Sequence, residues 1–392
     1  MGRIRVLHII PGIAIGEQSG GAEYFCVRLA RLLDKAVFDS RIYAMWRYGS
    51  PAESEWQERL EGEGIPVCGL NSPGVSLGSD LMAAFTGLWS VTSAFKPHVT
   101  NSHSERGDLF NMLLRLFHPA HPRAVRTVHL DQQWMTRPWL GVLLNQAVFP
   151  WAFQREIAVA GTIRQVLEAR LLTRLSKKKP ILCYNGIDQA LFQRGQIESP
   201  AGPASELPGT PPRLGIIGRL AEQKGHADLL QALGRVRLSH PVHLLVIGSG
   251  PSEEALREQA VRVGLAEYVH FLGSRQDVLA ILPRLDLLVS ASLWEGFPTV
   301  ILEAMALGVP VVATDVSGSR ELVRTGVTGV LTAAGQPAQL AEAIVQVLDD
   351  PAWATQMAIK ARQAASPFTI QNAAATYAAL YRQLVGPSVE RF

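Results

Sequence analysis

The sequence predicts an α/β protein built from two parallel β-sheets in tandem, each covered by helices on both faces. In both halves of the 392-residue chain, short and almost continuously apolar runs alternate with helical patterns. The halves are separated by Ser199–Pro212, where five prolines and two glycines rule out a packed helix or a central strand. At about 100–200 residues per domain, the length agrees with two domains.

We therefore expect two Rossmann-like domains over residues 1–195 and 213–368, a proline-rich linker over 196–212, and a C-terminal helix and tail over 369–392. The strands expected in the first domain are Val6–Ile10, Arg41–Trp46, Val99–Ser102, Ala124–Val128, Ile157–Ala160 and Ile181–Tyr184. Those expected in the second are Leu214–Ile217, His243–Ile247, Val269–Leu272, Leu285–Ser290 and Pro310–Ala313. Helical spacing is clearest in two apolar stripes, Leu340–Leu348 and Ile370–Leu384.

The composition excludes several classes of protein. With 47% hydrophobic residues and a net charge of +3, the chain is too apolar and too weakly charged to be disordered or to indicate a nucleic-acid partner. Polar residues interrupt every apolar stretch before about 18 residues, so we expect no transmembrane helix. The run after Arg5 contains His8 and Pro11, which favours a buried first strand over a signal peptide.

Cysteine usage and charge indicate the compartment and the partners. Cys26, Cys68 and Cys183 lack the spacing of metal ligands or of a disulfide framework, so we expect buried thiols in a reducing, cytoplasmic compartment. Residues 115–179 contain 11 basic and 3 acidic side chains. This bias is equally compatible with an anionic membrane surface as partner and with a solvated basic face.

The first motif is Gly218–Gly225, which directly follows the expected strand Leu214–Ile217. Ligands of open α/β sheets bind beyond the carboxyl ends of the strands, so a site is expected in such a loop. Arg219 offers a planar fork of donors and Lys224 a point charge, which together suit a diphosphate. Taken by itself, however, a pair of surface cations is the simpler interpretation, and the GxxxxGK[ST] phosphate loop is absent.

The second motif is Glu295–Ala306, which follows the expected strand Leu285–Ser290. Pro298 suits the first turn of a helix, whose leading amides form an anion site. Glu303 lies one turn beyond Thr299, on the same helix face. Two carboxylates would repel a phosphate, whereas a carboxylate can accept two hydrogen bonds from a sugar diol.

Together, GRLAEQKG and the Glu-x7-Glu spacing within EGFPTVILEAMALGVPVVAT resemble the family-4 retaining glycosyltransferases of GT-B fold. The resemblance covers essentially the whole chain and includes Ser19–Glu23, Thr127–His129, Tyr184–Asp188, Asp315–Gly318 and Glu321. It implies two Rossmann-like domains whose parallel sheets face a central cleft, the first on the acceptor side and the second binding the nucleotide sugar. It also implies that the C-terminal helix crosses back to the first domain.

The resemblance implies roles for individual residues. Arg219 and Lys224 would bind the donor diphosphate, Glu303 the ribose, and Glu295 the transferred sugar. His129 would lie beside the reacting carbon and act with Arg219, Lys224 and Glu295 in catalysis. The further donor-binding residues implied are Gly20, Gly21, Gly273, Arg275, Gly296, Phe297, Pro298, Thr299 and Val300. The family often has glycine where Pro298 stands, and the proline removes one amide donor.

His103 and Arg106 follow the expected strand Val99–Ser102, so they are candidates for acceptor contacts. A structural role for His103 is at least as well supported. Aromatic side chains lie within Gln132–Phe153, among them Trp134, Trp139 and Trp151, near Arg137 and Arg155. They suit either a membrane interface or the core of the first domain.

The sequence has no Asp-x-Asp beside a strand, so we expect a metal-independent enzyme without a cofactor. The resemblance implies retention of the anomeric configuration in a hexosyltransferase. We expect a nucleotide-diphosphate sugar as donor, UDP before GDP, and a glycan or lipid-linked acceptor in polysaccharide or glycolipid biosynthesis. The enzyme would be cytoplasmic, with peripheral docking on the inner membrane face as the further hypothesis.

Other functions remain in competition with this interpretation. A catalytically silent sugar-nucleotide-binding partner of another transferase would retain the same motifs. A sugar-nucleotide epimerase shares the GT-B architecture but lacks this Glu-x7-Glu context, and phosphorylases are much longer. A nicotinamide dehydrogenase is disfavoured because Gly248-Ser249-Gly250 lacks the third glycine of the dinucleotide fingerprint.

Overall fold

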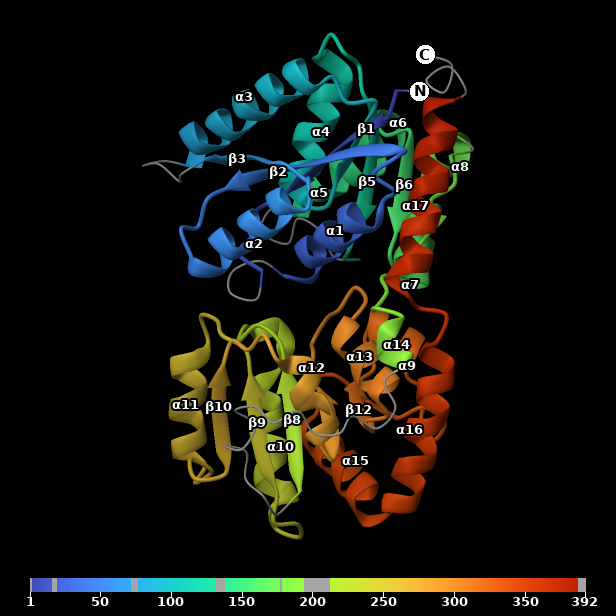
Figure 1. The fold of residues 1–392 in the computed structure, drawn as a ribbon. Helices are drawn as coiled ribbons and strands as arrows, with labels where there is room; N and C mark the ends of the chain where they lie inside the picture. The colour runs from blue at the N-terminus through green and yellow to red at the C-terminus, as the bar shows by residue number, and fades with distance from the viewer. Residues whose placement is uncertain are drawn as a thin grey trace. The chain divides into compact units, whose positions relative to one another are not determined.

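The computed structural model describes residues 2–15, 20–71, 77–130, 138–176, 178–193 and 212–386. The chain forms two compact units, Met1–Asn185 with Ile370–Phe392, and Gly186–Thr369 (Figure 1). All of the expected linker except Pro212 lies outside the described residues, as do Ser19, Trp134 and Arg137.

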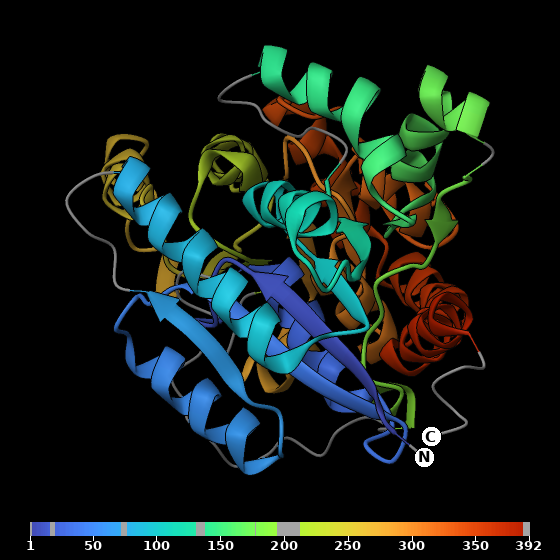
Figure 2. The ribbon, with the colours of Figure 1, turned by 90° about the horizontal axis from the view of Figure 1, so that it is seen from above.

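The first unit contains a seven-stranded sheet in the order β3-β2-β1-β4-β5-β6-β7, with every neighbouring pair parallel. Its strands are β1 (Ile4–Ile10), β2 (Phe38–Trp46), β3 (Val67–Asn71), β4 (Val99–Ser102), β5 (Arg123–Val128), β6 (Arg155–Ala158) and β7 (Ile181–Leu182). Its helices are α1 (Gly21–Leu32), α2 (Pro51–Gly62), α3 (Leu77–Phe95), α4 (Glu105–Phe117), α5 (Pro138–Leu143), the π-helical turn η1 (Leu144–Val148), α6 (Phe149–Ala152), α7 (Gly161–Ala169), α8 (Leu171–Ser176) and α17 (Ile370–Val385). Figure 2 shows α2 and α3 on opposite sides of β3.

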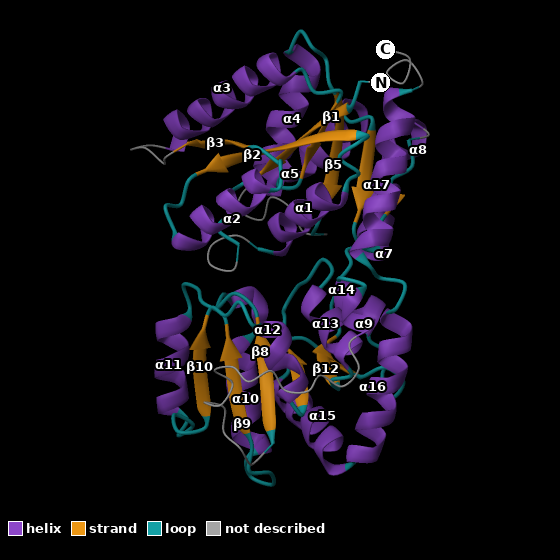
Figure 3. Ribbon diagram, viewed as in Figure 1, coloured by secondary structure: helices purple, strands orange, loops and turns teal. Residues whose placement is uncertain are grey.

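The second unit contains a six-stranded sheet in the order β10-β9-β8-β11-β12-β13, again parallel throughout (Figure 3). Its strands are β8 (Arg213–Ile217), β9 (His243–Ile247), β10 (Val269–Gly273), β11 (Leu287–Ser290), β12 (Val311–Thr314) and β13 (Val330–Thr332). Its helices are α9 (Ala190–Gln193), η3 (Glu222–Lys224), α10 (His226–Val236), α11 (Glu253–Arg262), α12 (Val278–Ile281), η4 (Leu282–Arg284), α13 (Thr299–Leu307), α14 (Ser317–Leu322), α15 (Pro337–Asp349) and α16 (Pro351–Ala365). The strand order reverses between β8 and β11, which is where ligands bind in doubly wound sheets.

The predicted fold class is confirmed, with differences at the edges of the sheets. All eleven expected strands form, although the run Ile181–Tyr184 pairs only over Ile181–Leu182 and the strand expected at Ile157–Ala160 begins at Arg155. Two further strands, β3 and β13, are not predicted from the sequence. Both are short edge strands, and Gly69 inside β3 weakens the pattern further.

The C-terminal helix α17 packs within the first unit, against α1 and the strands β1 and β4. Tyr377 and Tyr381 of its apolar stripe are completely buried. The Tyr381 hydroxyl accepts a hydrogen bond from Asn101 Nδ2 at 2.9 Å, and the Tyr377 hydroxyl pairs with Thr127 Oγ1 at 3.0 Å. These bonds satisfy the buried phenols and fix the helix against the carboxyl half of the sheet.

A buried charge network, Arg126–Asp108–Glu156–Arg170, joins β5, α4, β6 and the C-cap of α7. The Arg126 guanidinium lies 3.3 Å from Asp108 and 3.6 Å from Glu156, and Glu156 also pairs with Arg170. The side chain of Arg126 is inaccessible to solvent and stacks on the Phe149 ring at 4.3 Å. Pairing of every member makes this burial tolerable.

The aromatic side chains of the segment that precedes Arg155 divide between the core and the surface of the first unit. Phe149 and Phe153 are core residues, whereas Trp139 and Trp151 are 70% and 65% exposed. Among the described helices, none is both long and apolar enough to cross a bilayer.

Candidate functional site

In the second unit, the two sequence motifs form adjacent loops beyond the carboxyl ends of β8 and β11. The loop after β8 is joined to the loop after β11 by two hydrogen bonds through Gln223. Its carbonyl accepts from the Leu293 amide at 2.7 Å, and its Nε2 donates to the Trp294 carbonyl at 3.0 Å. The motifs, about 70 residues apart in the sequence, are thus one structural site.

Lys224 and Glu295 form an ion pair at the centre of this site. The Glu295 carboxylate is buried and also accepts a hydrogen bond from Ser292 Oγ at 2.8 Å. The Lys224 side chain is 23% exposed, so it is partly accessible to solvent. The pair presents a cation next to a carboxylate whose position is fixed from two sides.

Two glycines permit the close approach of loops at this edge of the sheet. Gly225 has φ +62° and packs so tightly that an added Cβ would lie 2.0 Å from the Ala291 carbonyl oxygen. At Gly248, after β9, an added Cβ would lie 2.0 Å from the Gly218 carbonyl oxygen. The Gly248-Ser249-Gly250 turn therefore serves loop packing here, which gives its glycines a role outside a dinucleotide fingerprint.

The helix α13 starts directly after the second loop, with Pro298 as its N-cap in an extended conformation. Phe297 is buried against Phe368, with ring centroids 5.6 Å apart, and Thr299 and Val300 are half-buried. Gly296 is tightly covered, because a Cβ on Gly318 of α14 would lie 2.3 Å from its carbonyl oxygen.

Glu303 is half-buried on α13, one turn after Thr299 and between the buried Leu302 and Ala304. Arg219 is exposed on the loop that also carries Lys224. The structure thus brings Arg219, Lys224 and Glu295 into one pair of loops, with Glu303 on the helix that follows.

The remaining two expected donor-binding residues of the second unit are Gly273, the last residue of β10, and Arg275, in the loop that follows it. Gly273 has φ +67°, and its carbonyl accepts from the Gly248 amide at 2.8 Å. Arg275 binds Asp277 through two hydrogen bonds, of 2.8 Å and 2.7 Å. These bonds lower the pKa of Asp277 and direct the Arg275 guanidinium toward its own loop.

In the first unit, Gly20 and Gly21 begin α1, where the Gly20 amide donates to Glu23 Oε2 at 2.9 Å. A Cβ on Gly20 would lie no closer than 3.6 Å to a described neighbour, and one on Gly21 would meet no described atom within 4 Å. Packing among the described residues therefore does not require glycine at either position.

The other candidates of the first unit separate into two groups. His129, which follows β5, is half-buried and pairs with His103, whose Nδ1 lies 3.2 Å from His129 Nε2. His103 is 3% exposed and also approaches His8 on β1, whereas Arg106 is exposed in the first turn of α4. The two acceptor candidates thus do not meet: His103 lies beneath His129, and Arg106 faces solvent.

Burial lowers the pKa of all three histidines. It lowers that of His8 to about 4 and that of His129 to about 3, and it lowers that of His103 well below the ordinary value. His8, Cys26 and His103 offer potential metal-ligand atoms within 4.8 Å of one another. Burial also raises the pKa of the Cys26 thiol, which opposes the thiolate that a metal needs.

Sequence reasoning missed His8 and Ser292 as members of these sites. His8 interrupts an apolar strand, and that was the only signal. Ser292 lies three residues before Glu295, a spacing that has no meaning until the loop is folded.

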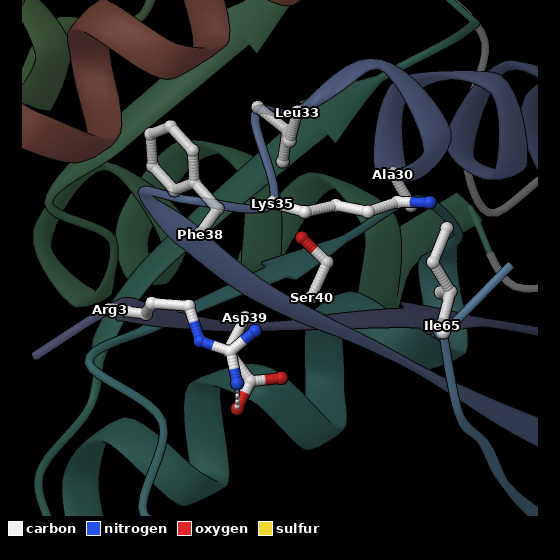
Figure 4. Close-up of a pocket in the computed structure, with 9 residues that line it drawn as sticks. Arg3, Ala30, Leu33, Lys35, Phe38, Asp39, Ser40 and Ile65 are labelled. Carbon is white, nitrogen blue, oxygen red and sulfur yellow. Dashed lines mark ion pairs between the residues drawn. The ribbon is translucent and has the colours of Figure 1, made fainter.

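A small cavity of 170 Å³ lies elsewhere in the first unit, lined by residues that include Arg3, Lys35, Asp39 and Ser40 (Figure 4). It adjoins the amino end of β2, and Arg3 and Asp39 approach to 4.0 Å there. This is the opposite end of the strands from the one where α/β ligands bind, so the cavity is separate from the candidate site.

Solved structures resemble the chain over nearly its whole length. Anabaena HepE in complex with UDP and glucose matches with a TM-score of 0.79 at 22% identity, over 97% of this chain and 100% of that one. A sucrose-phosphate synthase of Thermosynechococcus elongatus matches with a TM-score of 0.80 at 21% identity, over 97% and 99%. At these identities the likeness shows the fold, which is GT-B, with two Rossmann-like units.

Curated relatives resemble part of the chain. Glycogen synthase of Mycobacterium tuberculosis is 37% identical over 201 residues, 50% of this chain and 47% of the relative. The lipopolysaccharide core biosynthesis mannosyltransferase LpsB of Rhizobium meliloti is 34% identical over 210 residues, 51% and 60%. The chain thus spans about half the length of these relatives.

Two family models match successive stretches of the chain. Residues 19–191 match Glycosyltransferase Family 4, and residues 211–350 match Glycosyl transferases group 1. The chain belongs to the family-4 glycosyltransferases of GT-B fold.

Proposed function

We propose that the protein is a retaining hexosyltransferase that uses a nucleotide-diphosphate sugar. The observation that carries the proposal is the Lys224–Glu295 pair, held between two loops at the switch point of the second sheet. This pair supports the proposal because it could offer a cation to phosphate and a carboxylate to sugar hydroxyls, next to the start of α13, whose amides favour anions.

Each donor contact follows from the chemistry of the side chain. Arg219 and Lys224 neutralise the diphosphate, and Glu303 accepts hydrogen bonds from the ribose diol. Glu295 accepts from hydroxyls of the transferred sugar, and His129 provides a further contact to that sugar. UDP is preferred over GDP as the nucleotide of the donor. Two proteins of similar fold have been solved with UDP: HepE, and the pneumococcal O-GlcNAc transferase GtfA, which also contains GlcNAc.

The proposed reaction requires no metal. In a front-side attack, the bond from the acceptor oxygen to the anomeric carbon forms as the bond to the phosphate oxygen breaks. The acceptor proton passes to that leaving oxygen, and the charge that develops on the diphosphate is stabilised by Arg219, Lys224 and helix-terminal amides.

A thermal-shift panel of UDP-, GDP-, ADP- and TDP-sugars tests donor choice. A donor at 100 times its Kd should stabilise the folded protein by about 2.7 kcal/mol. Slow hydrolysis of the stabilising donor, undiminished by EDTA, would support a metal-independent transferase. Binding without any hydrolysis or transfer would indicate a silent binding partner, and interconversion of the sugar at the nucleotide level would indicate an epimerase.

The acceptor is proposed to be glycan or lipid-linked, with docking of the enzyme on an anionic membrane. Exposed apolar side chains gather on α5, α6 and α8, which are linked through η1; we call this set the apolar patch: Trp139, Val142, Leu143, Trp151, Leu171 and Leu175. Cations border it, because Arg174 and Lys179 are exposed and Lys178 donates to the Trp151 carbonyl at 3.2 Å. Apolar side chains bordered by cations suit an anionic bilayer surface.

Vesicle flotation tests the docking. The protein should float with anionic vesicles at low salt and remain behind with neutral ones, and Trp139→Ser with Trp151→Ser should abolish flotation. Leu238→Ser, at an 88% exposed leucine of the second unit, is the matched control. Flotation that is unchanged in the double variant would remove the apolar patch from the proposal.

A further inference from the structure

Three histidines of the first unit form a row at the carboxyl edge of its sheet. His8 belongs to β1, while His103 and His129 follow the neighbouring strands β4 and β5. His8 Nδ1 lies 3.5 Å from His103 Nε2, and His103 Nδ1 lies 3.2 Å from His129 Nε2. The row runs from the completely buried His8 to the half-buried His129.

Neutral rings restrict the protons in this row to two arrangements. A neutral imidazole has one N–H donor and one bare acceptor nitrogen. If both contacts are hydrogen bonds, either every ring is protonated at Nδ1 and donates outward, or every ring is protonated at Nε2 and donates inward. Burial keeps the rings neutral at pH 7, because it lowers the pKa of each.

The buried end of the row selects between the two arrangements. His8 Nε2 is buried and has no hydrogen-bond partner within the described ranges. Inward donation would place an N–H on this nitrogen, and a buried donor without an acceptor is among the rarest polar defects in proteins. Outward donation leaves only a bare lone pair there, which is the lesser penalty.

We propose that His8 and His103 hold His129 as its Nδ1–H tautomer, so that His129 offers its ligand a hydrogen-bond donor. His8 and His103 are then positioning residues, which act through His129. Only the identity of the ligand, a sugar hydroxyl that accepts this hydrogen bond, rests on the proposed function. Free histidine favours the Nε2–H tautomer, so the row imposes the opposite state.

NMR of the full chain with ¹⁵N-labelled histidine tests the tautomer without any substrate. Two-bond ¹⁵N–¹H correlations at pH 7 should show His8, His103 and His129 as neutral Nδ1–H rings, with each assigned by substitution. An Nε2–H or charged His129 would overturn the proposal. So would stoichiometric zinc in metal analysis, because a metal on His8, Cys26 and His103 would occupy the nitrogens that the row requires.

Two variants of His103 separate positioning from packing. In His103→Asn the amide nitrogen takes the approximate place of Nδ1 and can still donate to His129, whereas His103→Leu has a similar size and no donor. We expect His129 to stay Nδ1–H in His103→Asn and to shift toward Nε2–H in His103→Leu. Equal tautomer populations in the two variants would contradict the proposal, and the wild-type spectrum remains decisive if either variant fails to fold.

Turnover gives a second readout of the same pair. His103→Leu should lose about tenfold more of kcat/KM than His103→Asn, because a lost or misdirected hydrogen bond to the ligand is of this order. A wild-type protein with no transferase activity would refute the proposed function and leave the tautomer result standing. An active enzyme with an Nε2–H His129 would refute only the positioning row.

Discussion

Lys224 is the ion-pair partner of Glu295, a buried carboxylate from the neighbouring loop. The ammonium therefore has a structural role before any ligand arrives, since it neutralises a charge that is largely removed from water. A diphosphate at this site would compete with Glu295 for the same ammonium. We therefore expect stability and donor binding to be coupled through this one side chain.

Removal of Lys224 should reduce both activity and stability, by separable routes. We expect Lys224→Met to lower kcat/KM by about 100- to 1,000-fold, the size of a lost charge-stabilising donor. It should also lower the free energy of unfolding by about 1–3 kcal/mol, because Glu295 stays buried without its partner. Steady-state kinetics and urea titration measure the two effects.

The double variant Lys224→Met with Glu295→Gln separates these routes. It should regain most of the lost stability, because the unpaired carboxylate is gone, whereas its kcat/KM should stay at least as low as that of Lys224→Met. Lys360→Met, at an exposed lysine of α16, is the control and should match wild type in both measurements. Full turnover by Lys224→Met would refute the assigned role of the cation.

Gly225 should be intolerant of any side chain. Its positive φ and the 2.0 Å approach of an added Cβ to the Ala291 carbonyl oxygen act together. We expect Gly225→Ala to destabilise the protein by about 3 kcal/mol or more and to weaken the thermal shift caused by the donor. Differential scanning fluorimetry with and without donor provides both values.

Gly264 provides the matched comparison for this glycine. It has φ +70°, but an added Cβ would meet no described atom within 4 Å. Gly264→Ala should therefore cost only about 1 kcal/mol, from backbone strain alone, and leave the donor shift unchanged. Equal destabilisation by the two substitutions would show that the close approach to Ala291 is unimportant.

The loops of the second unit could be predicted because local sequence encodes them. One apolar run is followed by Gly218 and two cations, and another is followed by the Glu-Gly turn at Glu295. Parallel strands place their carboxyl ends at the same edge of the sheet, so both motifs are expected there. The pairing of Lys224 with Glu295 could not be predicted in the same way. It depends on the order β8-β11, which brings together loops that are far apart in the chain.

The interior polar groups of the first unit escaped prediction for a related reason. Arg126 and Glu156 stand in strands where a polar residue usually marks an exposed position or a strand end. Their burial becomes reasonable only when Asp108 and Arg170 arrive from other elements. The burial of His8 could not be predicted for the same reason, because its partner His103 lies 95 residues away.

The buried charge network should be a sensitive point for stability. Glu156→Gln leaves Arg170, which is 2% exposed, without its carboxylate and removes one of two carboxylates from Arg126. We expect a loss of about 3–5 kcal/mol in the free energy of unfolding. Glu168→Gln, which breaks an exposed pair with Arg164, should change it by less than about 0.5 kcal/mol. Similar urea midpoints for the two variants would contradict a structural role for the network.

Acid should destabilise the first unit through its buried histidines. Burial lowers the pKa of His8 to about 4 from an ordinary value of 6.5, so the unfolded chain binds a proton that the folded chain refuses. Between these two values the unfolded state holds more protons, and the free energy of unfolding falls as the pH falls, by about 1.4 kcal/mol per pH unit for one such group. Urea titrations at pH 6.5 and pH 5 should therefore show a loss of about 2 kcal/mol from His8 alone, which His8→Phe should remove.

His121→Asn, at an exposed position with φ +39° that asparagine tolerates, should keep the wild-type pH dependence. If His8→Phe retains the full acid sensitivity, other groups take up the proton, and the assignment of His8 as a buried, neutral ring is contradicted.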